Sequence, residues 1–390
     1  MKAISIFNLR AIHPAFILLV MSFFPGSYAV CFPEYFPLSG SDTASRSKEV
    51  LQKAGELTDI YGSLRFKVGF AFSGETGVQD DASRMGIKGA IPIGRGFDAI
   101  MQLEVGVGLV GNKTAIKFSG DPGGAYGEID NVFTSRLGYV GVRSKYGQIT
   151  WGKQWSAYSD IGGWTDSYNA FGGEASGTYS AGTDGAVSGS GRASNSFQYR
   201  LPLKYFEVCA QIQNRSITDS STSWADTYSF SLVLKPVTGL KIGAAYNKVR
   251  DGIQNPDLEI NKPKYGDEAW VAGINYNDKT VNAIFTSSIF KNHEKDELGN
   301  YFSGYGLELY LEYRFREHWR FYGGFNYLQP TGNGIGGEYR IQYLDFGSAY
   351  AFGRSSKVFI ETRLDDSRNH DGSKSRLGVF AFGMFFEFGY

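Results

Sequence analysis

From Ile60 onward the sequence alternates bulky apolar residues with polar ones at a period of two. Side chains point alternately to the two faces of a β-strand, so each such segment has one apolar and one polar face. The polar face carries long charged side chains, as Arg65 and Lys67 show within 61–72. The pattern is strongest at 61–72, 97–109 and 307–316, and it recurs near 84–91, 205–213, 240–247, 281–290, 320–327 and 357–365. A soluble sandwich accounts for one such strand, but not for so many with this contrast between faces.

The connections between these segments alternate between long and short. Short turns lie near Pro92–Arg95, Lys145–Gly147, Pro202–Lys204, Pro236–Gly239, Asn277–Asp278, Glu317–His318 and Gly353–Ser355. Long polar stretches lie near 73–81, 110–131, 155–191, 215–226, 250–266, 291–304, 329–337 and 366–374. This alternation predicts eight hairpins, and therefore an all-β, antiparallel transmembrane barrel of 16 strands over 60–390. Outer-membrane barrels have short periplasmic turns and long external loops.

Composition supports a barrel and excludes other classes. The 39 basic and 39 acidic residues balance, so no positive excess indicates nucleic acid, and we predict no such partner. No run of 18 apolar residues could form a spanning helix. A chain with 30 Phe, 25 Tyr and 6 Trp is too aromatic for a disordered one. Backbone polar groups in lipid must be satisfied internally, and without a spanning helix only a closed sheet does this.

The sequence offers little for catalysis or metal binding. Two cysteines and four histidines, without metal-like spacing, argue against a metal site. No nucleophile elbow or nucleotide loop in a βαβ unit is present. We therefore predict no cofactor, no metal and no enzymatic activity. Cys209 falls on the polar face of its strand and is expected to be a free thiol, although a bond to Cys31 in an oxidising periplasm stays open.

The N-terminus has the features of a secretory signal peptide. Lys2 and Arg10 precede the apolar run from Ala15 to Phe24, and small residues at Ser27 and Ala29 suit a signal peptidase. We predict a signal peptide over 1–29 and an N-terminal periplasmic extension over 30–59, where β alternation is absent.

Aromatic residues mark strand ends and the C-terminus. In the final strand, one face carries Phe380, Phe382, Met384, Phe386, Phe388 and the terminal Tyr390. Such an aromatic end looks like an outer-membrane assembly signal. Aromatic girdles flank the lipid-facing band of these barrels, and the side chains expected there are Tyr61, Trp151, Tyr313 and Trp319.

Several motifs resemble the Gram-negative general diffusion porins, most strongly over 60–200. They are Tyr61-Gly62-Ser63-Leu64-Arg65, Ser83-Arg84-Met85-Gly86-Ile87-Lys88-Gly89, Arg136-Leu137-Gly138-Tyr139 and Tyr146-Gly147-Gln148-Ile149-Thr150-Trp151-Gly152. The resemblance implies a barrel of sixteen strands in the outer membrane, in contact with lipid and lipopolysaccharide. It also implies a homotrimer that passes small hydrophilic solutes and ions by passive diffusion. The extension before Ile60 and the terminal Tyr390, where Phe is commoner, depart from the family.

In that family the third external loop folds into the barrel and narrows it. The matching loop here is 155–191, where Phe171-Gly172-Gly173-Glu174 is similar to the family's constriction turn. By resemblance, Arg84, Arg136 and Arg192 match the basic wall of the constriction, and Arg65 lies two residues from another basic position. Asp166 and Glu174 match acidic positions on the loop, whereas Ala170 stands where the family often has another acid.

Two alternatives stay open at this point. A channel selective for sugar, nucleoside or anion would need an aromatic stripe or a longer arginine ladder, and Tyr310 and Tyr322 leave the sugar form open. A closed barrel acting as an adhesin or structural protein would place its function in the loops.

Overall fold

The structure is a computed structural model, and it describes residues 58–110, 132–178, 189–214, 225–250, 267–332, 337–352 and 356–389. The predicted signal peptide, nearly all of the predicted extension, Cys31, Tyr390 and the turn at 353–355 lie outside the described residues. So do most of the expected long stretches at 110–131, 215–226 and 250–266. No helix in the part that the structure describes is long and apolar enough to cross a membrane.

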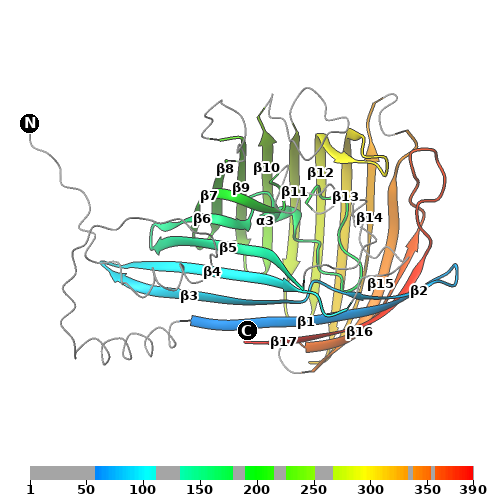
Figure 1. Cartoon of the computed structure of the whole chain (residues 1–390), viewed down its shortest axis with the longest axis horizontal. Helices are drawn as coiled ribbons and strands as arrows, with labels where there is room; N and C mark the ends of the chain where they lie inside the picture. Colours follow the sequence, from blue (N-terminus) through cyan, green and yellow to red (C-terminus); the bar gives the residue numbers. More distant parts are fainter. Residues whose placement is uncertain are drawn as a thin grey trace, which may run out of the picture.

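Antiparallel strands form one continuous sheet that closes on itself (Figure 1). The first strand pairs with the last in a register from Gly62 opposite Phe388 to Ala71 opposite Val379. The strands are β1(Thr58–Ala71), β2(Thr76–Asp80), β3(Arg84–Gly94), β4(Phe97–Val107), β5(Phe133–Ser144), β6(Gly147–Trp155), β7(Arg192–Pro202), β8(Phe206–Gln213), β9(Thr227–Val237), β10(Leu240–Val249), β11(Glu268–Asn277), β12(Val281–Lys295), β13(Tyr301–Phe315), β14(Trp319–Pro330), β15(Ile341–Phe352), β16(Ser356–Asp365) and β17(Val379–Phe388).

The seventeen labelled strands make a barrel of sixteen, because β2 and β3 together form one barrel strand. Both pair with β1: Phe66 lies opposite Asp80, and Ser63 lies opposite Arg84. Three residues, 81–83, face two on β1, which is a β-bulge with Ala82 at φ 58°. The predicted fold, an antiparallel 16-stranded barrel, is confirmed.

Two expected loops are shorter than the sequence indicated. The stretch 73–81 contains β2, so β1 and β2 are joined only by residues 72–75. The stretch 291–304 is also mostly strand, because β12 ends at Lys295 and β13 begins at Tyr301. The polar residues of these two stretches suggested loops, but many of them lie within strands.

The period of two places apolar side chains outside the barrel and polar ones inside. Phe70, Phe321 and Phe382 are exposed on the outer face, whereas Lys67 and Glu308 are buried in the interior. Cys209 is a buried free thiol. In a soluble protein the apolar side chains would face the interior. Here they face outward, as expected for a sheet whose outer face contacts lipid.

The prediction that Tyr61 belongs to an outer aromatic girdle is wrong. Its side chain is only 2% exposed and its hydroxyl donates to Glu104, at 3.0 Å, inside the barrel. Tyr61 has the same parity as Arg65, so its strand position directs it inward. The other expected girdle residues, Trp151, Tyr313 and Trp319, are exposed.

Candidate functional site

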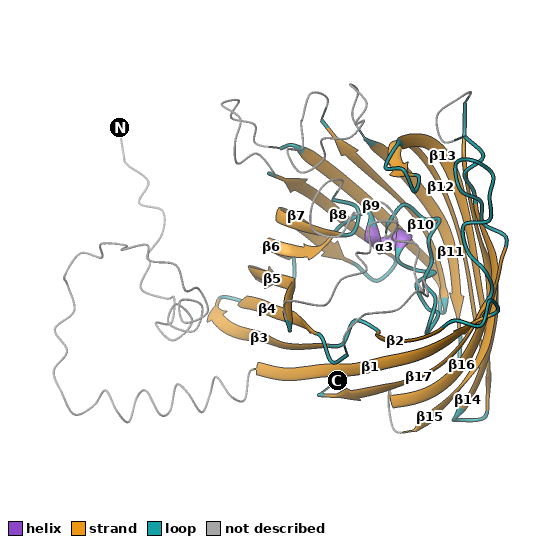
Figure 2. Cartoon of the chain, turned by 45° about the vertical axis from the view of Figure 1, so that its right-hand side comes forward, coloured by secondary structure: helices purple, strands orange, loops and turns teal. Residues whose placement is uncertain are grey.

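The described residues of the connection between β6 and β7, 156–178 and 189–191, fold into the barrel, and we call them the inner loop. It begins with a short helix, α3(Ser159–Gly162), which lies within the ring of strands (Figure 2). Asp160 of α3 accepts hydrogen bonds from Arg200 at 2.8 Å and from Ser231 at 2.6 Å. Burial raises the pKa of this carboxyl above its ordinary value, although both partners act in the opposite direction.

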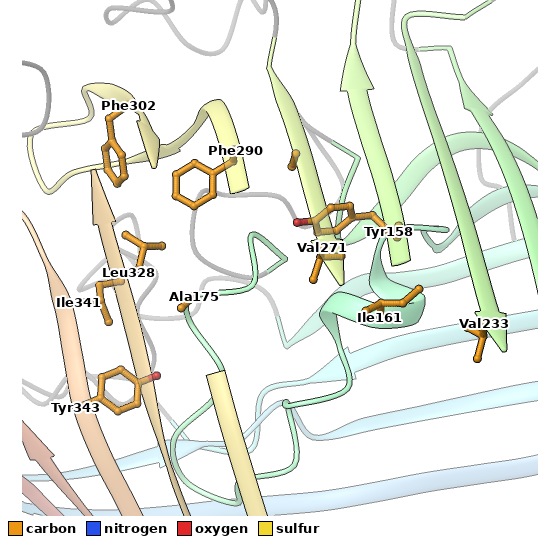
Figure 3. Packing of buried hydrophobic residues seen from close by; sticks show 12 residues of the cluster. Tyr158, Ile161, Ala175, Val233, Val271, Phe290, Phe302, Leu328, Ile341 and Tyr343 are labelled. Atoms are coloured by element: carbon orange, nitrogen blue, oxygen red, sulfur yellow. The ribbon is translucent and has the colours of Figure 1, made fainter. Parts of the chain in front are cut away.

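Apolar side chains of the inner loop pack against the barrel wall. Tyr158, Ile161 and Ala175 are fully buried and belong to a cluster that includes Val271 of β11 and Phe290 of β12 (Figure 3). Burying a large apolar side chain contributes about 1.5–3 kcal/mol. The cluster therefore holds the loop against this part of the barrel wall.

A glycine in the wall makes this close approach possible. A Cβ added to Gly306 of β13 would lie 1.8 Å from the carbonyl oxygen of Ala175. A residue with a side chain would therefore push the inner loop away from the wall.

Two buried carboxylates hold the backbone of the inner loop. Glu308 of β13 accepts hydrogen bonds from the amides of Ala175 and Ser176, and from the hydroxyl of Thr165. Glu361 of β16 accepts from the amides of Asn169 and Phe171, both at 2.9 Å. Charge-assisted bonds of this kind are roughly twice as strong as neutral ones.

Glu174 is anchored by arginines of the C-terminal wall and loop. Its carboxylate accepts hydrogen bonds from both terminal nitrogens of Arg376, at 3.0 and 2.8 Å, and lies 4.0 Å from Arg363. Burial lowers the pKa of Arg376, but Glu174 and Asp365 outweigh this effect, so the pKa of Arg376 is raised. Glu174 is only 2% exposed.

The four predicted wall arginines come from β1, β3, β5 and β7. Arg65 pairs with Glu387 at 2.7 Å, and Arg136 pairs with Glu104 at 2.7 Å. The guanidinium of Arg192 lies 5.7 Å from the centre of the Trp155 ring. Among the described residues, Arg84 makes no ion pair.

One cavity of about 450 Å³ brings these groups together, and we call it the aperture cavity. Across it, Lys67 of β1 donates to the carbonyl oxygen of Ala170, at 2.7 Å, and pairs with Asp81 at 2.6 Å. Asp166 is exposed at its edge. Its lining includes all six predicted site residues: Arg65, Arg84, Arg136, Arg192, Asp166 and Glu174.

Comparison with known proteins identifies the family. The sequence pattern of the Gram-negative porins matches residues 54–370. The chain belongs to the Gram-negative porin family. It is an outer-membrane channel for passive diffusion, as the sequence motifs indicated.

This porin is similar to several characterised relatives across nearly its whole length. It is 25% identical to the outer membrane porin protein OmpD of Citrobacter koseri, over 88% of this chain and 95% of the relative. It is also 25% identical to the outer membrane porin PhoE of Enterobacter cloacae, over 87% of this chain and 94% of the relative.

Solved structures show the same fold at lower identity. Salmonella typhi OmpF, in a complex with daunomycin, has a TM-score of 0.66 at 18% identity, covering 85% of this chain and 97% of that one. OmpT of Vibrio cholerae, an outer membrane protein solved in trimer form, has a TM-score of 0.60 at 13% identity, covering 85% and 99%.

Sequence reasoning missed the residues of the porin that position the inner loop. Glu308 and Glu361 have the inward parity of their strands, so the alternation alone marks them as interior carboxylates. Asp80 and Asp81 line the aperture cavity, but they were assigned to a loop because the bulge interrupts the alternation. Arg376 lies in the connection between the last two strands, and no local signal links it to Glu174.

Proposed function

We propose that the aperture cavity is the constriction of this porin, and that it determines which ions and small hydrophilic solutes pass. The proposal is supported by one observation above all: the basic wall residues and the acidic loop residues line the same cavity, although they come from five separate segments. Pore diameter and rings of charge together set the selectivity of a channel.

The two acidic residues of the inner loop have different roles in this proposal. Glu174 is neutralised by Arg376 and fixes the position of the loop. Asp166, which is exposed, contributes its charge to the lumen. The positive wall and Asp166 together impose a transverse field that orders water, so apolar solutes pass less readily than polar ones.

A reversal-potential measurement in planar bilayers tests this assignment. We expect the double variant Arg84→Gln/Arg192→Gln to shift the reversal potential towards cation selectivity, because two positive charges are lost from the constriction. The matched control is Arg143→Gln/Lys88→Gln, which removes two charges whose side chains are 50% and 45% exposed. Equal shifts in the two double variants would reject the aperture assignment while leaving the channel itself intact.

We further propose that the porin is a homotrimer embedded in outer-membrane lipid and lipopolysaccharide, and that it carries out no catalysis. The trimer is supported by family membership and by the trimer form of Vibrio cholerae OmpT. Light scattering of the purified protein, corrected for bound detergent, gives the test: a mass of one chain would contradict it.

A further inference from the structure

A second group of cations lies inside the barrel and meets the four wall arginines at Arg65, which belongs to both groups. Strand register places them in one lateral row across β13 to β1. Arg314 lies opposite Arg320, Arg320 opposite Ala349, Ala351 opposite Lys357, Lys357 opposite Phe385, and Phe385 opposite Arg65. We call these residues the basic row.

The row lies near the short-turn end of the barrel. Arg320 is the second residue of β14 and Lys357 the second of β16, directly after short connections. A cavity of about 370 Å³ lies over the row and borders the aperture cavity, since Arg65, Asp166 and Tyr168 line both. This volume is within the range of small-molecule sites.

The two ends of the row are already neutralised. Arg314 pairs with Glu312 at 2.7 Å, and Glu312 also accepts from the hydroxyl of Tyr310 at 3.0 Å. Arg65 pairs with Glu387 at 2.7 Å. The carboxylates of Glu312 and Glu387 are therefore already paired with the cations at the two ends of the row.

The two central cations differ from the ends. Within the part of the chain that the structure describes, no ion pair or hydrogen bond involves Arg320 or Lys357. The Lys357 ammonium lies 4.9 Å from the centre of the Phe385 ring. Asp166 lines the same cavity.

Between the two cations the wall is flat, because the residues there are small. Ala349 and Ala351 of β15 separate Arg320 from Lys357, while the rings of Tyr310, Tyr322 and Phe385 border the cavity. A guanidinium binds a carboxylate or phosphate through two parallel hydrogen bonds, and an ammonium adds a point charge. The cavity that the two alanines help to line leaves room for the body of such a solute.

We propose that the basic row is a binding station for small solutes that carry carboxylate or phosphate groups, held by Arg320 and Lys357 over Ala349 and Ala351. The station is separate from the constriction, and an anion there sits directly beside it. Binding that is weak and close to a second site assists conduction, because a solute must both enter and leave.

Current measurements on the full-length mature porin in planar bilayers test the station. At constant KCl concentration, succinate and inorganic phosphate are added in turn, and glycerol serves as the neutral control. We expect saturable reduction of the current by at least one of the two anions and none by glycerol. Block by succinate alone or by phosphate alone identifies the preferred group. Absence of block by both overturns the proposal.

Two variants distinguish a binding site from a general positive field. For Arg320→Gln/Lys357→Gln we expect the half-blocking concentration to rise about tenfold or more, as for the loss of close charge contacts. The control Lys88→Gln/Arg143→Gln removes the same charge from other strands and should leave the half-blocking concentration unchanged. An equal change of the half-blocking concentration in the two double variants would contradict the binding station.

A third variant removes space without changing charge. Ala351→Leu fills the floor between the cations, so we expect it to weaken block about as strongly as the charge variant. The KCl reversal potential should stay at the wild-type value in Ala351→Leu, whereas it depends on the constriction arginines in the test above. The two proposals therefore fail independently. Undiminished block in Ala351→Leu would overturn the placement of the anion over the alanines.

Discussion

The carboxylate of Glu174 accepts hydrogen bonds from two nitrogens of Arg376, at 3.0 and 2.8 Å, and so joins the inner loop to the last long connection, 366–378. The two residues are 202 positions apart. Both side chains are almost completely buried, with exposures of 2% for Glu174 and 8% for Arg376. The inner loop is therefore held in part by an ion pair between two segments that are far apart in the sequence.

Removal of one partner should destabilise this junction. Arg376→Gln leaves Glu174 buried with only Arg363 nearby, and breaking a buried pair from one side typically costs about 3–5 kcal/mol. We expect a lower denaturant midpoint and more frequent brief closures of the channel, because the inner loop is less firmly held. Urea unfolding in lipid vesicles and single-channel recording measure the two effects.

The control for Arg376 is Arg340→Gln. Arg340 pairs at 3.2 Å with Asp366, and both side chains are partly exposed, so the change should cost roughly 0–1 kcal/mol. The double variant Glu174→Gln/Arg376→Gln should be less destabilised than the sum of its single changes, since the two residues act as a pair. If the destabilisation of the double variant equals the sum of the two single changes, the two residues do not act as a pair.

The glycine under the inner loop gives a second prediction. Gly306→Ala places a methyl group where the carbonyl oxygen of Ala175 lies, so the loop must move or the wall must bend. We expect a loss of about 1–3 kcal/mol, the usual range for overpacking, together with an altered single-channel conductance. Gly138→Ala is the matched control, because its nearest neighbour would be a side-chain atom of Leu103 at 3.6 Å. A conductance identical to wild type in Gly306→Ala would contradict this view of the loop.

The barrel and the inward direction of the basic residues could be predicted from the sequence because both follow from a period of two. A strand position with the parity of Arg65 points into the lumen whatever residue occupies it. Tyr61 shows the limit of residue-type rules: its aromatic ring suggested a girdle, but its parity directs it inward, where Glu104 accepts a hydrogen bond from its hydroxyl. Parity is the stronger signal inside a strand, because backbone geometry sets it.

The partners of these residues could not be predicted in the same way. Which carboxylate meets which arginine depends on strand register, on the bulge at 81–83 and on the path of the inner loop. The alternation of apolar and polar residues predicts neither the register, nor the bulge, nor the path of the loop. Arg320 and Lys357 become neighbours across β15 only through the register of three strands. Their juxtaposition is a property of the closed barrel rather than of any local motif.

The carboxylate of Glu308 provides a third prediction, because it accepts several bonds from the inner loop. Glu308→Gln keeps the size of the side chain but turns an NH₂ group towards backbone amides that also donate. We expect larger fluctuations of the open-channel current and faster proteolysis of the loop. Glu268→Gln is the control, since Glu268 is partly exposed and contacts Tyr246 and Lys248 on the wall. Equal current noise in Glu308→Gln and wild type would show that the position of the loop does not depend on the Glu308 carboxylate.

A turn aspartate on the short-turn side gives a pH-dependent prediction. Asp278 accepts hydrogen bonds from the backbone amides of Val281 and Thr280, at 2.7 and 2.6 Å, and these bonds lower the pKa of its carboxyl. A lowered pKa in the folded state means that Asp278 adds stability when the pH is above the pKa of the unfolded chain. This stability is lost as the pH falls through the folded pKa. We therefore expect Asp278→Ala to lower the unfolding temperature near neutral pH, and the difference from wild type to shrink as the pH falls below about 4.

Asp371 lies in an external loop, and hydrogen bonds from Ser373 lower the pKa of its carboxyl. The variant Asp371→Ala therefore tests whether turn aspartates at the two ends of the barrel behave alike. Calorimetry between pH 3 and 7 measures the differences, and a gap between Asp278→Ala and wild type that widens in acid would contradict the role assigned to the carboxylate.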